Sequence, residues 1–119
     1  MKDQDLTGRV IGCFFIVYNE LGFGLPESVY SSALEILFRE EGIVASREHR
    51  IDVFFRGKKI GWFRADWLIE ERLILELKVG HRLPPGSKDQ LITNLRMSKK
   101  DLGLLLYFGP VPEIQRVAL

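Results

Sequence analysis

The segment FRADWLIEERLILELKVG, residues 63–80, joins two apolar stretches through a charged turn. Its composition favours two β-strands, and the charged EER at positions 70–72 is typical of a hairpin turn. Three ionisable residues interrupt the apolar pattern: Asp66, Glu76 and Lys78. Ionisable side chains are rarely placed in a core-bound hairpin unless another group pairs with them. The hairpin therefore predicts a site that uses these charges.

The spacing of the two acids places them opposite each other in one register. A three-residue turn centred on Glu71 would pair residues equally distant from that position, which include Asp66 and Glu76. Their Cβ atoms would lie roughly 5 Å apart, and two carboxylates at that distance repel by roughly 3 kcal/mol at an effective dielectric near 20. A two-residue turn would instead place Asp66 opposite Leu75 and remove the pairing, unless a bulge restores it.

A divalent cation offsets such repulsion directly. Mg²⁺ is often held by one or two carboxylates, with waters and substrate phosphates completing its coordination. Glu76 and Lys78 share a face of the strand, so the ammonium could orient an attacking water or stabilise developing negative charge. These are the parts that a phosphodiester hydrolase needs. A solvated Glu-x-Lys salt bridge is the alternative reading of the same pattern.

Periodicity along the rest of the chain predicts a mixed α/β domain. The helices expected are residues 6–21, a second beginning around Pro26 and ending at Gly42, and 87–98 with Ser87 as N-cap and Leu91, Ile92 and Leu95 facing inward. The strands expected are an alternating stretch at 51–55, then, after a turn at 56–59, residues 60–69, 73–78, 102–108 and a short edge strand at 114–117. Strands 73–78 and 102–108 flank a helix and should be parallel neighbours in a mixed sheet.

Composition limits the class of protein. The chain has 119 residues, enough for a single domain (1–119), with 46% hydrophobic and 28% charged residues. No run of 18 apolar residues predicts a membrane span, and the first ten residues are unlike a secretory signal. A lone cysteine, Cys13, forms no internal disulfide. We therefore expect a cytoplasmic protein without a membrane partner.

Basic residues concentrate after the hairpin although the net charge is only +1. Residues 78–100 hold six basic side chains against one acid. Arg82, Lys88 and Arg96 are candidates for phosphate contacts there, although a solvated helix face has the same composition. Gln90 and Asn94 lie one helical turn apart and could bind a phosphate or a water, or form an ordinary polar face.

A third acid lies in GLPESVY, residues 24–30. Glu27 falls in the first turn of the second expected helix, where the helix dipole favours a carboxylate. It could serve that role alone, or it could point into the metal site. Tyr30 is expected to pack its ring in the core.

Together, three blocks of the sequence resemble the GxxExxY proteins, which are grouped with the PD-(D/E)XK nuclease superfamily. The blocks are VYNELGFGLPESVY (17–30), FRADWLIEERLILELK (63–78) and KDQLITNLRMSKKDLGLLLYFG (88–109), and the similarity extends from about residue 6 to 117. The resemblance implies an αβββαβ core and Mg²⁺-dependent phosphodiester cleavage with an Asp…Glu-x-Lys signature.

Carried over by position, the resemblance implies that Asp66, Glu76 and the backbone carbonyl of Leu77 bind the metal. Lys78 would be the catalytic lysine. The helix acid and the glutamine of the following helix would be Glu27 and Gln90. The sequence departs from the family at three places, where histidine, histidine and tyrosine are usual: Tyr18, the neighbourhood of Ser87, and Asn94.

The function expected is therefore a divalent-metal-dependent nuclease, with Mn²⁺ as a possible substitute for Mg²⁺ and DNA favoured over RNA. The alternative is a non-catalytic nucleic-acid-binding or partner-binding module that retains the nuclease fold. Because so short a chain leaves little surface for recognising a substrate, a homodimer is a further expectation.

Overall fold

The computed structural model describes residues 4–119. The first three residues, part of the N-terminal segment judged unlike a secretory signal, lie outside this range. The described chain contains, in order, α1 (Gln4–Leu21), α2 (Glu27–Glu40), β1 (Ala45–Phe55), β2 (Lys58–Ile69), β3 (Leu73–Val79), α3 (Ser87–Ser98), β4 (Leu102–Phe108) and β5 (Glu113–Ala118). This order confirms the predicted mixed α/β class.

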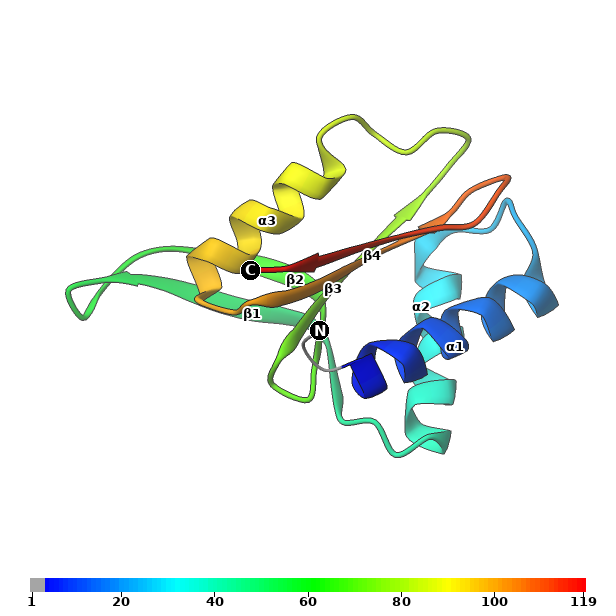
Figure 1. The fold of residues 1–119 in the computed structure, drawn as a ribbon, viewed down its shortest axis with the longest axis horizontal. Helices are drawn as coiled ribbons and strands as arrows, with labels where there is room; N and C mark the ends of the chain where they lie inside the picture. The colour runs from blue at the N-terminus through cyan, green and yellow to red at the C-terminus, as the bar shows by residue number, and fades with distance from the viewer. Residues whose placement is uncertain (1–3) are drawn as a thin grey trace.

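The five strands form one sheet in the order β1-β2-β3-β4-β5. Neighbours are antiparallel except β3 and β4, which are parallel as predicted for strands joined through α3. Helices α1 and α2 pack on one face of the sheet and α3 on the other (Figure 1). No helix within residues 4–119 is both long and apolar enough to cross a membrane.

Strand β3 divides its side chains between the two layers. Leu73, Leu75 and Leu77 belong to the core under α1 and α2, whereas Ile74 joins the cluster under α3. Side chains alternate along a strand, so the next even-numbered positions, Glu76 and Lys78, follow Ile74 toward α3. The fold thus keeps the ionisable residues of β3 off the larger core.

Strand β4 is buried along its whole length, from Leu102 to Phe108, as its continuous apolar sequence predicts. Gly103 lets α3 approach this strand closely. A Cβ added there would lie 3.0 Å from Leu91 Cδ1 and 3.1 Å from Leu95 Cδ1. The two leucines of α3 are fully buried as expected, whereas Ile92 is only partly buried.

The β2–β3 hairpin has the three-residue turn that the sequence predicts. Trp67 pairs with Leu75, Leu68 with Ile74 and Ile69 with Leu73, a register centred on Glu71. Glu70 and Glu71 take positive φ angles of 52° and 59° to close the turn. The ladder then stops one pair short of Asp66 and Glu76, so the expectation that these two residues form a regular cross-strand pair is wrong.

Two strand boundaries differ from the sequence prediction. β1 begins at Ala45, well before the alternating residues at 51–55, because its first half carries polar side chains that hide the period of two. The expected four-residue turn at 56–59 is a two-residue turn, in which Arg56 and Gly57 have φ angles of 50° and 77°. Positive φ at both central residues matches the twist of a hairpin, so β2 starts at Lys58.

The predicted N-cap role of Ser87 is also wrong. Gly86, with φ of 81°, precedes the helix as its N-cap, and Ser87 is the first helical residue. The Ser87 hydroxyl donates to the Pro84 carbonyl oxygen at 2.6 Å, so it fastens the preceding loop and leaves the helix end uncapped by a side chain.

Tyr30 fixes the loop that leads into α2. Its ring is fully buried and stacks on Phe108 with 4.0 Å between ring centroids. Its hydroxyl donates to the Gly22 carbonyl oxygen at 2.5 Å and accepts from the Leu25 N–H at 3.3 Å. The packing role predicted for Tyr30 is confirmed, and the hydroxyl adds a tether that holds the start of α2.

Replacing Tyr30 with Phe should keep the ring and remove only this tether. We expect the free energy of unfolding to fall by about 1–3 kcal/mol, because a partly buried carbonyl and a partly buried amide lose their partner. Urea denaturation measures the change. Val29→Ala, at a neighbouring exposed position, is the control and should change stability by no more than about 0.5 kcal/mol. Equal stability of Tyr30→Phe and wild type would contradict the tether.

Candidate active site

Asp66 lies where β2 separates from β3. Beyond the last regular pair, its Oδ2 accepts a hydrogen bond from the Leu77 backbone N–H at 2.7 Å. The side chain therefore takes the place of a backbone acceptor in the ladder. This bond holds the Asp66 carboxylate beside β3 at Leu77, the residue between Glu76 and Lys78.

The pairing of β2 with β1 is interrupted at the same point. Arg47 pairs with Trp67 and His49 with Ala65, but no pair joins the intervening Glu48 and Asp66. Glu48 has a φ of 50°, a left-handed conformation that is uncommon for a residue with a Cβ. Irregular backbone on the β1 side and the side-chain bond on the β3 side together set Asp66 apart from the regular sheet.

Side chains of β2 change faces across this irregularity. Ala65 belongs to the cluster under α3, whereas Trp67, two residues later, belongs to the core under α1 and α2. In a regular strand these two residues would share a face. The strand therefore twists around Asp66, and the outer part of the β1–β2 hairpin takes a different orientation from the part that packs in the core.

Glu76 is half-buried and interacts with Asp66. Desolvation is the largest cause that raises the pKa of the Glu76 carboxyl, and with the Asp66 charge and a hydrogen bond to the Asp66 carboxylate it brings this pKa to about 8. Asn94 Nδ2 opposes the shift by donating to Glu76 Oε1 at 3.4 Å, and Gln90 Nε2 donates to Asn94 Oδ1 at 3.2 Å. The repulsion expected between two nearby carboxylates is present.

Glu27 joins the site from the first residue of α2. Partial burial raises the pKa of its carboxyl, Asp66 raises it further, and Lys78 lowers it. The structure thus brings Glu27, Asp66, Glu76 and Lys78 into one electrostatic neighbourhood, with Gln90 linked to it through Asn94. Their catalytic roles stay predictions.

Glu48 is an acid of this neighbourhood that sequence reasoning missed. Its charge also raises the pKa of Glu27. It was missed because the predicted strand began only at residue 51, so nothing placed Glu48 across from Asp66. A positive φ at a glutamate has no sequence signature.

The positions that depart from the resembled family have structural partners here. The Tyr18 hydroxyl donates to the carbonyl oxygens of Gly109 and Pro110, at 2.6 Å and 2.9 Å. Asn94 is 6% exposed, and its amide donates a hydrogen bond to Glu76 and accepts one from Gln90. The Asn94 side chain therefore helps to orient the Glu76 carboxyl.

The oxygen atoms present suit a hard divalent cation. Within residues 4–119, no three His, Cys, Asp or Glu side chains are grouped so that they could hold a metal by themselves. The predicted metal ligands, the carboxylates of Asp66 and Glu76 and the backbone carbonyl of Leu77, stay a prediction. Such oxygen donors are those preferred by Mg²⁺ and Mn²⁺, and a cation would relieve the repulsion that raises the pKa of Glu76.

Comparison with known proteins identifies the fold family. The family model of the PD-(D/E)XK nuclease superfamily matches residues 4–117. The chain belongs to this superfamily. Its members are generally nucleases that act on nucleic acid and typically use divalent metals such as Mg²⁺, so a nuclease-like domain is established here at that level. The narrower resemblance to the GxxExxY proteins stays a prediction.

One solved structure supports the superfamily fold. The crystal structure of SSO0001 aligns with a TM-score of 0.59 and 21% sequence identity over 76% of this chain. The match spans half of the length of SSO0001, and at this identity it bears on the fold alone. No curated protein matches the sequence.

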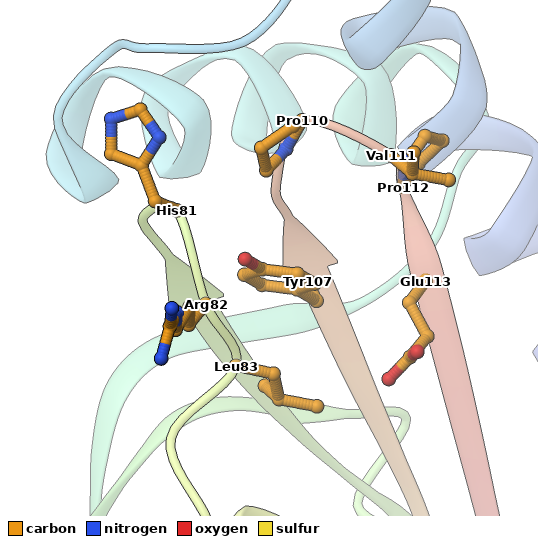
Figure 2. A pocket seen from close by; sticks show the side chains of 8 residues that line it. All are labelled: His81, Arg82, Leu83, Tyr107, Pro110, Val111, Pro112 and Glu113. Atoms are coloured by element: carbon orange, nitrogen blue, oxygen red, sulfur yellow. The ribbon is translucent and has the colours of Figure 1, made fainter.

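The predicted phosphate-contacting residues spread over the surface beyond the site. Arg82, Lys88 and Arg96 are all exposed. Arg82 lines a pocket of about 470 Å³ between the loop after β3 and the β4–β5 turn, with Tyr107 at its side (Figure 2). The Tyr107 hydroxyl donates to the Gly80 carbonyl oxygen at 2.6 Å. Neither the acids of the site nor Lys78 lines this pocket.

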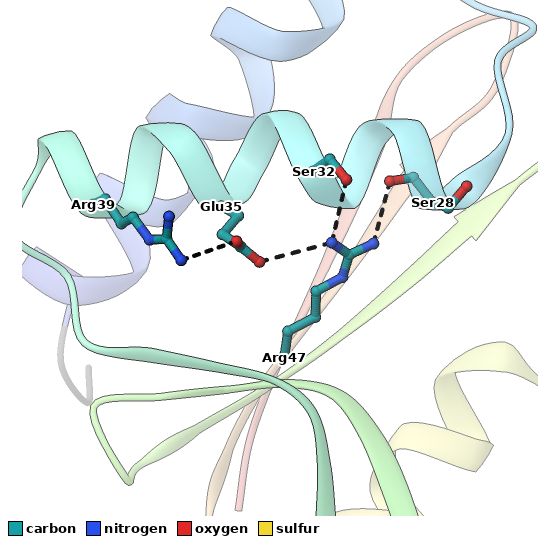
Figure 3. A network of polar contacts seen from close by, with 5 residues as sticks. All are labelled: Ser28, Ser32, Glu35, Arg39 and Arg47. Carbon is teal, nitrogen blue, oxygen red and sulfur yellow. Dashed lines mark hydrogen bonds and ion pairs between the residues drawn. The ribbon is translucent and has the colours of Figure 1, made fainter.

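Arg47 ties the start of α2 to β1. Its guanidinium donates to the Ser32 hydroxyl and to the Ser28 carbonyl oxygen, both at 3.2 Å, and lies 3.7 Å from Glu35 (Figure 3). Glu35 also pairs with Arg39 at 3.1 Å. Glu27 immediately precedes Ser28, and Glu48 immediately follows Arg47. The hydrogen bonds of Arg47 to α2 therefore help to fix the positions of Glu27 and Glu48.

Replacing Arg47 with Met should therefore loosen α2 from the sheet. We expect the free energy of unfolding to fall by about 1–2 kcal/mol, because the hydrogen bonds to Ser28 and Ser32 are lost from a partly exposed position. Urea denaturation measures this loss. Arg39→Met removes a highly exposed arginine that pairs with Glu35, and its effect should stay within about 0.5 kcal/mol. Equal effects of the two substitutions would contradict the proposed tie.

The raised pKa of Glu76 gives stability a pH dependence in metal-free buffer. Between its ordinary value of 4.5 and about 8, the folded protein keeps a proton that the unfolded chain releases. Stability therefore decreases as the pH rises through this range. Glu76→Gln removes the ionisable group, so its stability relative to wild type should improve by on the order of a few kcal/mol from pH 5 to pH 8.5.

Urea denaturation in EDTA at several pH values tests this dependence. Glu20→Gln, an exposed acid of α1, serves as the control for an ordinary surface substitution. If the difference in the free energy of unfolding between Glu76→Gln and wild type stayed constant from pH 5 to pH 8.5, the raised pKa of Glu76 would be refuted.

Proposed function

We propose that the protein is a divalent-metal-dependent nuclease. Its active site for hydrolysing phosphodiester bonds is formed by Asp66, Glu76 and Lys78. The observation that supports this most directly is the meeting of two carboxylates where β2 and β3 separate, at a place where burial and the neighbouring Asp66 raise the pKa of Glu76 to about 8. A protein surface gains nothing in stability from such a pair. Within a nuclease superfamily fold, such a pair is best explained by chemistry.

The proposed metal ligands are the carboxylates of Asp66 and Glu76 and the carbonyl oxygen of Leu77. A bound Mg²⁺ or Mn²⁺ would supply Lewis acidity at a phosphoryl oxygen and would favour deprotonation of water. Asp66 is oriented by the Leu77 N–H, and Glu76 by Asn94. These bonds hold both carboxylates before substrate arrives, so little reorganisation is needed for the reaction.

Lys78 is proposed to position the attacking water and to stabilise negative charge that develops on the phosphoryl oxygens. It lies two residues after Glu76 and is close enough to Glu27 to lower the pKa of that acid. Glu27 is proposed to accept a hydrogen bond from the same water network. Its raised pKa makes it a better proton acceptor than an ordinary surface glutamate.

Cleavage assays test these roles. Single- and double-stranded DNA and RNA are incubated with the protein in Mg²⁺ or Mn²⁺, with DNA as the first substrate. We expect cleavage by wild type and a loss of at least about 10²-fold in Lys78→Ala, the magnitude typical of a group that moves or orients a proton. Asp66→Asn should be inactive at any Mg²⁺ concentration that supports wild type.

Arg39→Ala is the matched control, because it removes a highly exposed cation from α2 that has no proposed contact with nucleic acid, and it should retain most of the activity. Circular dichroism checks that each variant is folded. If wild type and Lys78→Ala cleaved at the same rate, the cleavage would come from a contaminant and the nuclease proposal would lose its support.

A further inference from the structure

The outer part of the β1–β2 hairpin projects away from the body of the molecule, at the end opposite to α1 and α2 (Figure 1). We call residues 50–64 the hairpin arm. Strand β2 runs from Asp66 at the candidate site to Lys58 at the turn, a length of roughly 26 Å at about 3.3 Å per residue. The arm therefore extends the candidate site over a distance comparable to several nucleotides.

The two faces of the hairpin arm differ. Ile51 and Phe63 pack against the cluster under α3. The opposite face carries Trp62, which is 52% exposed, beside Arg50 and Arg64, which pair with each other across the strands. The Arg50 Cζ atom lies 4.5 Å from the centroid of the Trp62 ring, and the Arg64 Cζ atom lies 6.0 Å from it. A flat aromatic surface is thus presented together with two guanidinium groups.

The charge of the arm is strongly positive. Residues 50–64 contain five basic residues and one acid, Asp52. This acid is already engaged, since its Oδ1 lies 3.1 Å from Arg50 Nε and 3.5 Å from Lys59 Nζ. Exposed apolar side chains accompany the cations toward the tip, namely Phe54, Phe55 and Ile60. The arm therefore suits a ligand that is both anionic and flat-faced.

We propose that the hairpin arm binds single-stranded nucleic acid, with bases stacking on Trp62 and phosphates contacting Arg50 and Arg64. Single strands are bound by aromatic platforms in cationic grooves because every base offers a π-face. A duplex conceals those faces in its own stack. Trp62 and Arg64 lie four and two residues before Asp66 on β2, so a nucleic acid bound to the arm would lie near the candidate site.

A second copy of the same arm is a poor occupant of this face. Two such faces brought together would oppose arginines with arginines, and like charges across a pairing are destabilising. The proposal rests on the proposed function in taking nucleic acid as the substrate. Binding by the arm, however, needs neither a metal nor Lys78, so the two proposals can fail separately.

Fluorescence anisotropy in EDTA tests the arm with a labelled 20-nucleotide single-stranded DNA, an RNA of the same sequence, and the duplex DNA. We expect Trp62→Ala to weaken binding of the single strands about tenfold or more, while Trp62→Phe keeps most of the affinity. Phe15→Ala, which removes an exposed aromatic ring from α1, is the matched control and should bind as wild type. Loss with DNA alone or RNA alone would identify which strand the arm takes.

Tryptophan fluorescence provides a direct signature of stacking. The only other tryptophan, Trp67, is 1% exposed, so quenching by a bound single strand would report on Trp62. The proposal would be overturned if Trp62→Ala bound single strands with unchanged affinity, or if it lost as much affinity for the duplex as for single strands. A difference in oligomeric state between Trp62→Ala and wild type, measured by sedimentation, would also overturn it.

The two proposals are separated by combining variants. If no cleavage depends on Lys78 while single-strand binding in EDTA depends on Trp62, the nuclease proposal fails and the arm assignment stands. If cleavage depends on Lys78 while Trp62→Ala binds and cleaves like wild type, the arm assignment alone is overturned.

Discussion

The candidate site depends on the hydrogen bond from the Leu77 N–H to Asp66 Oδ2. A backbone N–H inside a sheet must be satisfied, usually by the carbonyl of the adjoining strand. Here a carboxylate satisfies it, so β2 can leave β3 without leaving an unpaired donor. The same bond orients Asp66 and brings its charge beside Glu76. The same hydrogen bond therefore allows β2 to separate from β3 and places Asp66 beside Glu76.

Helix α2 depends on the sheet in a comparable way. Tyr30 stacks on Phe108 of β4 and ties down the loop before the helix, while Arg47 of β1 holds the first turns of α2 from the other side. Glu27 lies between these two attachments. The position of this acid is thus set by the core and by the opposite edge of the sheet, and the backbone dipole of α2 is directed at the same place.

The sequence predicts most of the fold because the apolar patterns are strong. The continuous apolar run of β4, the helical period of α1 and the symmetric hairpin about Glu71 each indicated an element that the structure contains. That register correctly predicted that Asp66 and Glu76 lie near each other, although Asp66 reaches β3 through its side-chain bond to Leu77 and not through a regular pair with Glu76. Local backbone geometry was beyond reach. The left-handed Glu48, the interrupted pairing at Asp66 and the N-cap at Gly86 are local backbone features that apolar periodicity does not indicate.

The charges of the site and of the hairpin arm are best understood together. Glu27, Glu48, Asp66 and Glu76 form a neighbourhood that repels a phosphate backbone, so affinity for a nucleic acid has to come from elsewhere on the surface. The arm carries the opposite charge on the same strand, ending two residues before Asp66. If the arm binds a nucleic acid and the acids bind a metal as proposed, the separation of these charges along β2 leaves each group free for its own ligand.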